Sequence, residues 1–312
     1  HRSIRRQRQM CIRDSDNTYI FFFSDHGGPL PRGKRSHYES GLKVPLIIRD
    51  PYVKSKIFVE EPVSFVDFAP TILSLAGISI PEHFQGIPFL GDKKSEKPRD
   101  YIFGSGDRFD ETYDRVRSVI SDEFIYVKNY HTDRPAYKDV LYRKNIDMTN
   151  EMLMLYNENK LNSDQKYWYR QTKTEEEFYH RSDDPYSLKN LITDPNYRKE
   201  IKVHRQALKN WQNDINDLGD IPEKSLLSIM WPKGVQPKTL KPEVFVSNNV
   251  VTVKSSTLGS SIGYILSDED FDPSLDDGWK LYHEPVIVNK RYIYVLSTRL
   301  GFEDSDIIKI KL

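Results

Sequence analysis

One short segment of the sequence gathers side chains that could bind a metal ion and an anion. Asp25 and His26 stand side by side, and two glycines come directly after them. A carboxylate oxygen and an imidazole nitrogen both bind divalent cations, and glycines let the backbone approach a bound group closely. Eight residues after His26 comes Lys34, flanked by Arg32 and Arg35, and its ammonium suits an oxyanion such as sulfate or phosphate. This set favours hydrolysis of an anionic ester.

The same residues also permit a purely structural interpretation. Asp25 could cap a turn, His26 could be an ordinary loop histidine, and the arginines could be surface charge. For His37, on the same segment, we expect a structural hydrogen bond rather than a place in the pocket.

The elements that would position this segment can be predicted from the hydrophobic pattern. Residues 18–23 are a continuous apolar run, which predicts a strand buried on both faces, as in a parallel sheet. Residues 44–48 predict a second buried strand. The Asp25–His26 pair would then lie beyond the carboxyl end of a strand, where ligands bind in α/β sheets. Residues 66–76 have helical spacing, with Gly77 as the C-cap.

Further patterns organise the rest of the chain. They predict a hairpin of strands 115–120 and 124–130, helical segments within 147–176, a short strand at 175–180, an amphipathic helix at 195–217, a Pro-rich linker at 231–242 and a small all-β module at 243–312.

Composition excludes several classes of function. The 312 residues carry 46 basic and 46 acidic side chains, so a formal net charge of zero gives no electrostatic footprint for nucleic acid or an anionic membrane. No apolar run approaches the roughly 20 residues that a membrane span needs. The single cysteine, Cys11, excludes an internal disulfide and a cysteine-based zinc site. Aromatic residues make up 12% of the chain, which indicates a folded core.

The first fifteen residues differ in character from the rest of the chain. Residues 1–15 are rich in arginine and lack apolar periodicity, and the string RQRQMCIRDS resembles translated sequencing-adapter read-through. We therefore expect a non-native tail, with a solvated basic tail as the alternative.

Four stretches of the sequence resemble the type I sulfatases of the alkaline phosphatase superfamily. Residues 17–51 resemble the second metal-and-sulfate segment of that family, and residues 63–90 its Asp-x-x-Pro-Thr-x-Leu helix and Gln-Gly-x-x-Leu element. Residues 110–130 and 176–201 are similar to the C-terminal subdomain. Together the resemblance covers residues 16–222.

The resemblance implies an α/β fold of the alkaline-phosphatase-like sulfatase type. Residues 16–110 would be the C-terminal part of the catalytic domain and its central sheet, and residues 111–230 the small antiparallel C-terminal subdomain. Residues 231–312 would form the small β module. This module resembles a β domain found at the C-terminus of some hexosaminidases and sulfatases. Its Tyr264, Trp279 and Tyr282 could stack on a sugar, although core packing of these aromatics is the simpler expectation.

The resemblance also implies roles for individual residues. Asp25 and His26 would be ligands of the active-site cation, usually Ca²⁺, with His26 where many relatives carry asparagine. Lys34 would contact the sulfate close to the leaving oxygen. The substrate pocket would further be lined by Arg108, Asp110 and Glu111.

One feature of the family is missing from the sequence. Type I sulfatases carry a Cys/Ser-x-Pro-x-Arg motif whose first residue becomes the formylglycine nucleophile, and no such motif occurs in the 312 residues. We therefore expect a C-terminal fragment of an exported, periplasmic or secreted sulfatase, acting on a sulfated carbohydrate or aryl sulfate. The alternatives are a phosphoesterase of the same superfamily and a non-catalytic carbohydrate-binding remnant. The sequence gives no indication of oligomeric state.

The missing motif leads to a first prediction. The purified chain, incubated with Ca²⁺ and an aryl sulfate, should release no sulfate above the rate of a buffer control, because it lacks the motif that supplies the nucleophile in the family it resembles. Appreciable turnover in a colorimetric assay would contradict this.

Overall fold

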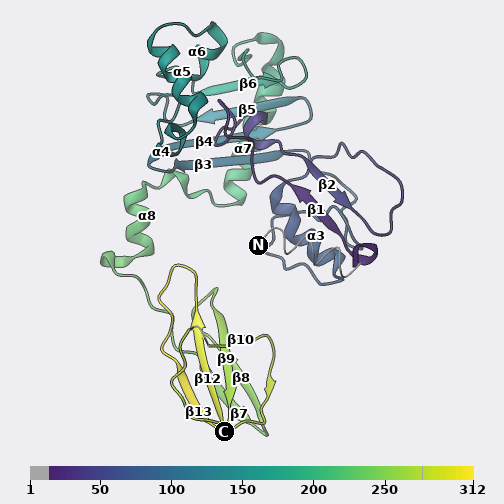
Figure 1. Ribbon diagram of the computed structural model, residues 1–312, viewed down its shortest axis with the longest axis vertical. Helices are drawn as coiled ribbons and strands as arrows, with labels where there is room; N and C mark the ends of the chain where they lie inside the picture. Colours follow the sequence, from purple (N-terminus) through teal and green to yellow (C-terminus); the bar gives the residue numbers. More distant parts are fainter. Residues whose placement is uncertain (1–13, 276) are drawn as a thin grey trace. The chain divides into compact units, whose positions relative to one another are not determined.

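The computed structural model describes residues 14–275 and 277–312 (Figure 1). The chain divides into two compact units, one ending at Asp217 and the other running from Leu218 to Leu312. The tail predicted at residues 1–15, with Cys11, lies almost wholly outside the described residues; only η1 (Asp14–Asn17) overlaps its end.

The chemistry-bearing segment, residues 24–38, begins where a strand of a two-stranded sheet ends. Strand β1 (Ile20–Phe23) pairs with β2 (Leu46–Arg49), and α2 (Glu39–Leu42) lies between them in sequence. The two strands are antiparallel, with Phe21 opposite Ile48. The prediction of a parallel sheet buried on both faces is therefore wrong, since Phe22 is 65% exposed and Ile47 62% exposed. An unbroken apolar run does not encode strand direction. Within the described residues, no second layer covers the face of the sheet that bears Phe22 and Ile47.

A short helix after this sheet is held by polar contacts. The 3₁₀ turn η2 (Phe65–Asp67) leads into α3 (Phe68–Leu75). Ala76 is the C-cap, and Gly77, predicted for that role, is the next residue and has the positive φ of 70° that ends the helix. The side chain of Asp67 accepts hydrogen bonds from the backbone N–H groups of Ser64 (2.9 Å) and Ile87 (2.7 Å). The Nε of Arg99 donates to Asp67 at 2.7 Å. This clamp explains how the loop after α3 is fixed to the helix.

The larger part of the first unit is built on a four-stranded antiparallel sheet. Its strands run in the order β3 (Ile102–Phe109), β4 (Thr112–Ile120), β5 (Phe124–Asn129) and β6 (Glu176–His180). The hairpin and the last strand were predicted, but β3 was not, because Gly104, Ser105 and Gly106 break its apolar pattern. Those glycines are needed, since a Cβ on Gly106 would lie 2.8 Å from the imidazole of His37.

The two faces of this sheet carry different layers. One face packs against α7 (Arg198–Asp214), which comes after η3 (Pro195–Tyr197), and buries a core that includes Val119, Tyr126, Phe178 and Leu208. Val116 and Val127 form a smaller cluster with Tyr38 of the chemistry-bearing segment. The helices α4 (Leu141–Lys144), α5 (Asp147–Asn157) and α6 (Ser163–Trp168) enclose an aromatic cluster around Trp168.

In the second unit, residues 243–312 form strands and loops, as the alternating pattern predicted. After η4 (Leu218–Asp220), α8 (Glu223–Met230) and η5 (Pro232–Gly234), the unit forms two antiparallel sheets ordered β10-β9-β12-β13 and β11-β8-β7. The strands are β7 (Glu243–Ser247), β8 (Val250–Lys254), β9 (Ser261–Ser267), β10 (Lys280–Leu281), β11 (Val286–Ile287), β12 (Tyr292–Thr298) and β13 (Ile308–Lys311). Helix α8 was not predicted.

The aromatic side chains singled out in this module serve its packing. Tyr264 and Tyr282 pack against the buried cluster around Val251 and Ile293. The indole of Trp279 lies over Gly263, and its Nε1–H donates to the carbonyl of Ser274 at 2.8 Å. These contacts support the expectation of core packing over that of a sugar platform.

The architecture as a whole is the predicted mixed α/β class followed by a β module. None of the helices in the described part of the chain combines the length and apolarity needed to cross a membrane.

The buried carboxylate of Asp67 provides a test of this fold. Asp67→Ala should lower the free energy of unfolding by about 3 kcal/mol, because it leaves a guanidinium and two backbone N–H groups without their acceptor. Urea denaturation measures the loss. The matched control, Asp122→Ala in the exposed turn after β4, should change stability by less than about 0.5 kcal/mol. Equal effects of the two substitutions would refute the clamp.

Candidate functional site

The Asp25–His26 pair comes one residue after β1, and a hydrogen bond orients its imidazole. The Nδ1 atom of His26 lies 2.8 Å from the carbonyl oxygen of Gly27. A carbonyl can only accept, so Nδ1 carries a proton and donates it to that oxygen. The hydroxyl of Ser24 donates to the carbonyl of His26 at 2.7 Å and stiffens the same turn.

The other ring nitrogen of His26, Nε2, faces a carboxylate. Nε2 lies 3.4 Å from Oδ2 of Asp25, whose side chain is 82% exposed. Two donor atoms that bind one cation at about 2.0–2.6 Å, in neighbouring positions around it, lie at a similar distance from each other. The pair therefore fits as part of a metal-ligand set. No cluster of three or more His, Cys, Asp or Glu side chains suited to a metal occurs within the described ranges, so these two residues fit only as a partial set.

The glycines of the segment allow it to fold back tightly on itself. The backbone N–H of Lys34 donates to the carbonyl of Gly28 at 2.8 Å, which closes the loop between them. A Cβ at Gly33 would lie 2.3 Å from that carbonyl oxygen, and one at Gly27 would lie 1.9 Å from the carbonyl oxygen of Ser40. Only glycine permits these approaches, so the loop conformation depends on these two glycines.

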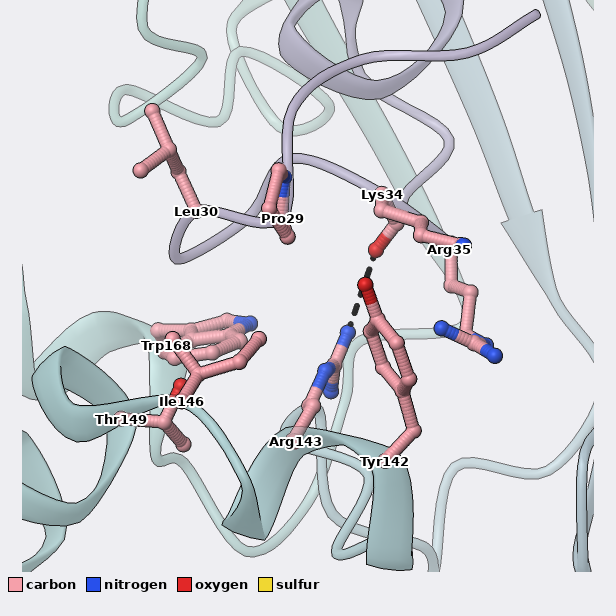
Figure 2. A pocket seen from close by; sticks show the side chains of 9 residues that line it. All are labelled: Pro29, Leu30, Lys34, Arg35, Tyr142, Arg143, Ile146, Thr149 and Trp168. Atoms are coloured by element: carbon pink, nitrogen blue, oxygen red, sulfur yellow. Dashed lines mark hydrogen bonds between the residues drawn. The ribbon is translucent and has the colours of Figure 1, made fainter. Parts of the chain in front are cut away.

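Lys34 lies in a pocket that the sequence did not reveal. Figure 2 shows its ammonium above the ring of Tyr142, at 4.7 Å from the centroid, with the guanidinium of Arg35 at 4.9 Å from the same ring. Arg143 donates to the carbonyl of Lys34 at 3.2 Å. The pocket is further lined by Pro29, Leu30, Ile146, Thr149 and Trp168. The aromatic and basic residues at 137–143 could have indicated a second side of the pocket, but nothing in the sequence linked them to residue 34.

The two arginines beside Lys34 have structural partners. Arg32 adopts a positive φ of 57°, stacks its guanidinium 4.2 Å from the ring centroid of Tyr38, and donates to the carbonyl of Ser187 at 2.9 Å. Arg35 pairs with Asp110. Lys34 makes no ion pair within the part of the chain that the structure describes. Of the three neighbouring cations, it is the one available for a ligand.

The predicted pocket residues on the β3–β4 hairpin lie at its tip. Asp110, with a φ of 52°, holds Arg35 through their ion pair. The Glu111 carboxylate accepts the backbone N–H of Leu141 at 2.8 Å and so fixes the start of α4. Arg108 donates to the carbonyl of Glu111 at 3.3 Å. The structure thus brings Asp110 next to the Lys34 loop. Substrate contacts by these three residues stay a prediction.

His37 is buried, as a structural role requires. Its ring is 8% exposed and lies 3.4 Å from the hydroxyl of Ser118, with the ring of Phe109 against its edge. Burial, with a smaller contribution from Arg117, lowers the pKa of His37 to about 4. The imidazole is therefore neutral at pH 7.

The low pKa of His37 makes stability depend on pH. Between its ordinary pKa near 6.5 and the folded value near 4, the unfolded chain binds a proton that the folded chain does not. Folding is therefore destabilised as pH falls, by about 3 kcal/mol at pH 4 from this residue. His37→Gln should abolish that part of the loss, measured by urea denaturation at pH 7 and pH 4.5. A variant that loses stability on acidification as steeply as the parent chain would contradict the assignment.

Comparisons with known proteins agree on one family. The sulfatase family model matches residues 13–78. An ulvan-active sulfatase from Formosa agariphila is 39% identical over 299 residues, which cover 95% of this chain and 50% of that protein. The human N-sulphoglucosamine sulphohydrolase is 28% identical over 232 residues, 66% of this chain and 44% of that protein. The chain thus spans about half the length of these relatives.

Solved structures give a weaker likeness. A protein whose structure was solved in complex with its substrate D-glucosamine-2-N,6-O-disulfate aligns at a TM-score of 0.46 and 22% identity, over 69% of this chain and 38% of that chain.

Proposed function

Because this chain belongs to the type I sulfatase family of the alkaline phosphatase superfamily, we propose that it serves the hydrolysis of sulfate esters carried by carbohydrates. The names of two relatives refer to ulvan and to N-sulphoglucosamine. We extend that class, a sulfated saccharide, to this chain. Most members of the family are exported, and we propose a periplasmic or secreted location on the same ground.

The observation that carries the proposal is the geometry of Asp25 and His26. Nε2 of His26 and Oδ2 of Asp25 lie 3.4 Å apart after the end of β1, and the carbonyl of Gly27 holds the other ring nitrogen of His26. These atoms would hold the Ca²⁺ expected from the family, together with ligands from outside the described residues. When bound, such a cation supplies positive charge to the sulfate oxygens. Formylglycine in the full-length enzyme belongs to the same proposal.

Lys34 has the properties of a sulfate contact. Its ammonium is a point charge without an ion pair in the described residues, and the Tyr142 ring at 4.7 Å limits its motion. A positioned cation of this kind binds the anionic group and stabilises negative charge on the leaving oxygen. We propose that Asp110 acts through Arg35, and Glu111 through the start of α4, by shaping the pocket on either side of Lys34.

Binding by the full chain tests this proposal without requiring turnover. In an NMR titration with Ca²⁺ present, glucosamine 6-sulfate should perturb the signals of residues 25–34, whereas unsulfated glucosamine should not. Lys34→Met should weaken binding about tenfold or more, because a charge-assisted hydrogen bond is lost, and Lys34→Arg should weaken it less. Asp25→Asn and His26→Gln should remove the effect of Ca²⁺ on the titration.

The control variant is Lys202→Met, on the exposed side of α7, which should bind like the parent chain. Equal binding of sulfated and unsulfated sugar would refute the proposal. Tighter binding of glucosamine 6-phosphate than of the 6-sulfate would favour a phosphoesterase instead.

A further inference from the structure

A second cavity in the first unit has an unusual charge composition. It lies between the β4–β5 face of the sheet, the loop that carries Arg35 to Tyr38, and the segment that includes α4 and α6. It shares Arg35, Arg143 and Trp168 with the Lys34 pocket. Its volume is about 60 Å³, whereas one water needs about 10–15 Å³ on the same measure. The cavity therefore has room for several waters or for one small polyatomic ion.

Two buried ammonium groups in this cavity share a single carboxylate. Lys138 and Lys173 are 6% and 8% exposed, and both pair with the same oxygen, Oδ2 of Asp114. Asp114 is 1% exposed, and its other oxygen, Oδ1, has no hydrogen-bond partner among the residues described. Two positive charges thus face one negative charge, which leaves one positive charge uncompensated. One buried acceptor, Oδ1 of Asp114, still needs a donor.

A third buried cation adds to the imbalance. Arg143 is 7% exposed and donates to two carbonyl oxygens, those of Lys138 and Lys34, at 3.0 and 3.2 Å. Its guanidinium also lies over the rings of Tyr137 and Trp168. No carboxylate pairs with Arg143 in the described part of the chain, and burial lowers its pKa.

The other cations at the cavity wall are already compensated. Arg35 pairs with Asp110, and Arg170 pairs with Glu177 at 2.8 Å. His37 at the same wall is neutral at pH 7, because burial lowers its pKa to about 4. The cavity therefore holds a surplus of two positive charges. An uncompensated charge costs several kcal/mol when it is buried, and water alone does not remove that surplus.

We propose that this cavity binds one small oxyanion group, a sulfate, phosphate or carboxylate, between the ammonium groups of Lys138 and Lys173 and the guanidinium of Arg143. An oxyanion offers several acceptor atoms to the donors of two ammonium groups and a guanidinium fork. A water bound beside it would supply the donor that Oδ1 of Asp114 lacks.

The oxyanion has two possible sources. It is either a free inorganic ion or a second anionic substituent of the saccharide that reaches Lys34, since the two cavities share Arg35 and Arg143. The site itself is independent of the proposed sulfatase function, and only the second source rests on it.

Thermal unfolding of the full chain tests the site, with inorganic sulfate as the probe and ionic strength held constant with chloride. Sulfate at a hundredfold excess over its Kd should raise Tm by about 5–10 °C in a saturable manner. Lys138→Met and Lys173→Met should each abolish the shift. In each variant the Asp114 carboxylate still pairs with one lysine ammonium. Because that pair is neutral, both variants should fold. Lys202→Met should keep the full shift.

The outcomes separate this site from the Lys34 pocket. If Lys34→Met abolishes the sulfate shift while Lys138→Met keeps it, the ion binds at Lys34, which overturns this inference and leaves the proposed function intact. Equal shifts in all variants, or none in the parent chain, also overturn it. Anomalous scattering from soaked selenate should place the ion within hydrogen-bond distance of Lys138 and Lys173.

A second titration distinguishes the sources. If the substituent belongs to the saccharide, a disulfated glucosamine should bind the parent chain at least tenfold more tightly than a monosulfated one, and Lys138→Met should remove that preference. If the ion is free, inorganic sulfate should protect the chain while the two sugars bind alike.

Discussion

The loop that bears the candidate site is fixed to the sheet through one buried carboxylate, that of Glu177. It is 1% exposed and accepts four hydrogen bonds, from Tyr38, Tyr179, Asn129 and Arg170, at 2.6–2.9 Å. Every acceptor position is thereby used, which is the condition under which a buried charge is tolerated. Tyr38 is the member that belongs to the loop, and its ring supports the guanidinium of Arg32 at 4.2 Å.

The support continues from Tyr38 to the residues that would meet a ligand. Arg32 reaches the carbonyls of Tyr186 and Ser187, which come after β6, and its own carbonyl accepts hydroxyls from Ser36 and Ser40. These contacts attach the loop to the region of strand β6, far away along the chain, and add to the Arg35–Asp110 ion pair and the Arg143 hydrogen bond to Lys34. The Lys34 loop is thus supported by the sheet, as a site requires if its side chains are to keep one geometry.

The sequence predicted the local features of this arrangement and missed its long-range ones. The Asp25–His26 pair, the strand before it and the glycines after it are neighbours in the chain, so their types and order carry the information. Strand β3 was missed because its glycines accommodate His37, a packing reason that no periodicity reveals. Glu177 stands in a run of three glutamates that resembles an exposed strand end. Only pairing with β5 shows that its side chain turns inward. The sequence likewise indicates ordinary surface lysines at 138 and 173, whereas in the fold both pair with the buried carboxylate of Asp114.

The open face of the two-stranded sheet bears on how this chain behaves in concentrated solution. Phe22 and Ile47 lie on it, and Phe58 in the loop after β2 is 97% exposed. Apolar area of this kind drives self-association, and such attraction weakens on cooling because it is largely entropic near room temperature. The colloidal stability of the chain should accordingly be greatest in the cold, the reverse of what a charge-mediated contact would show.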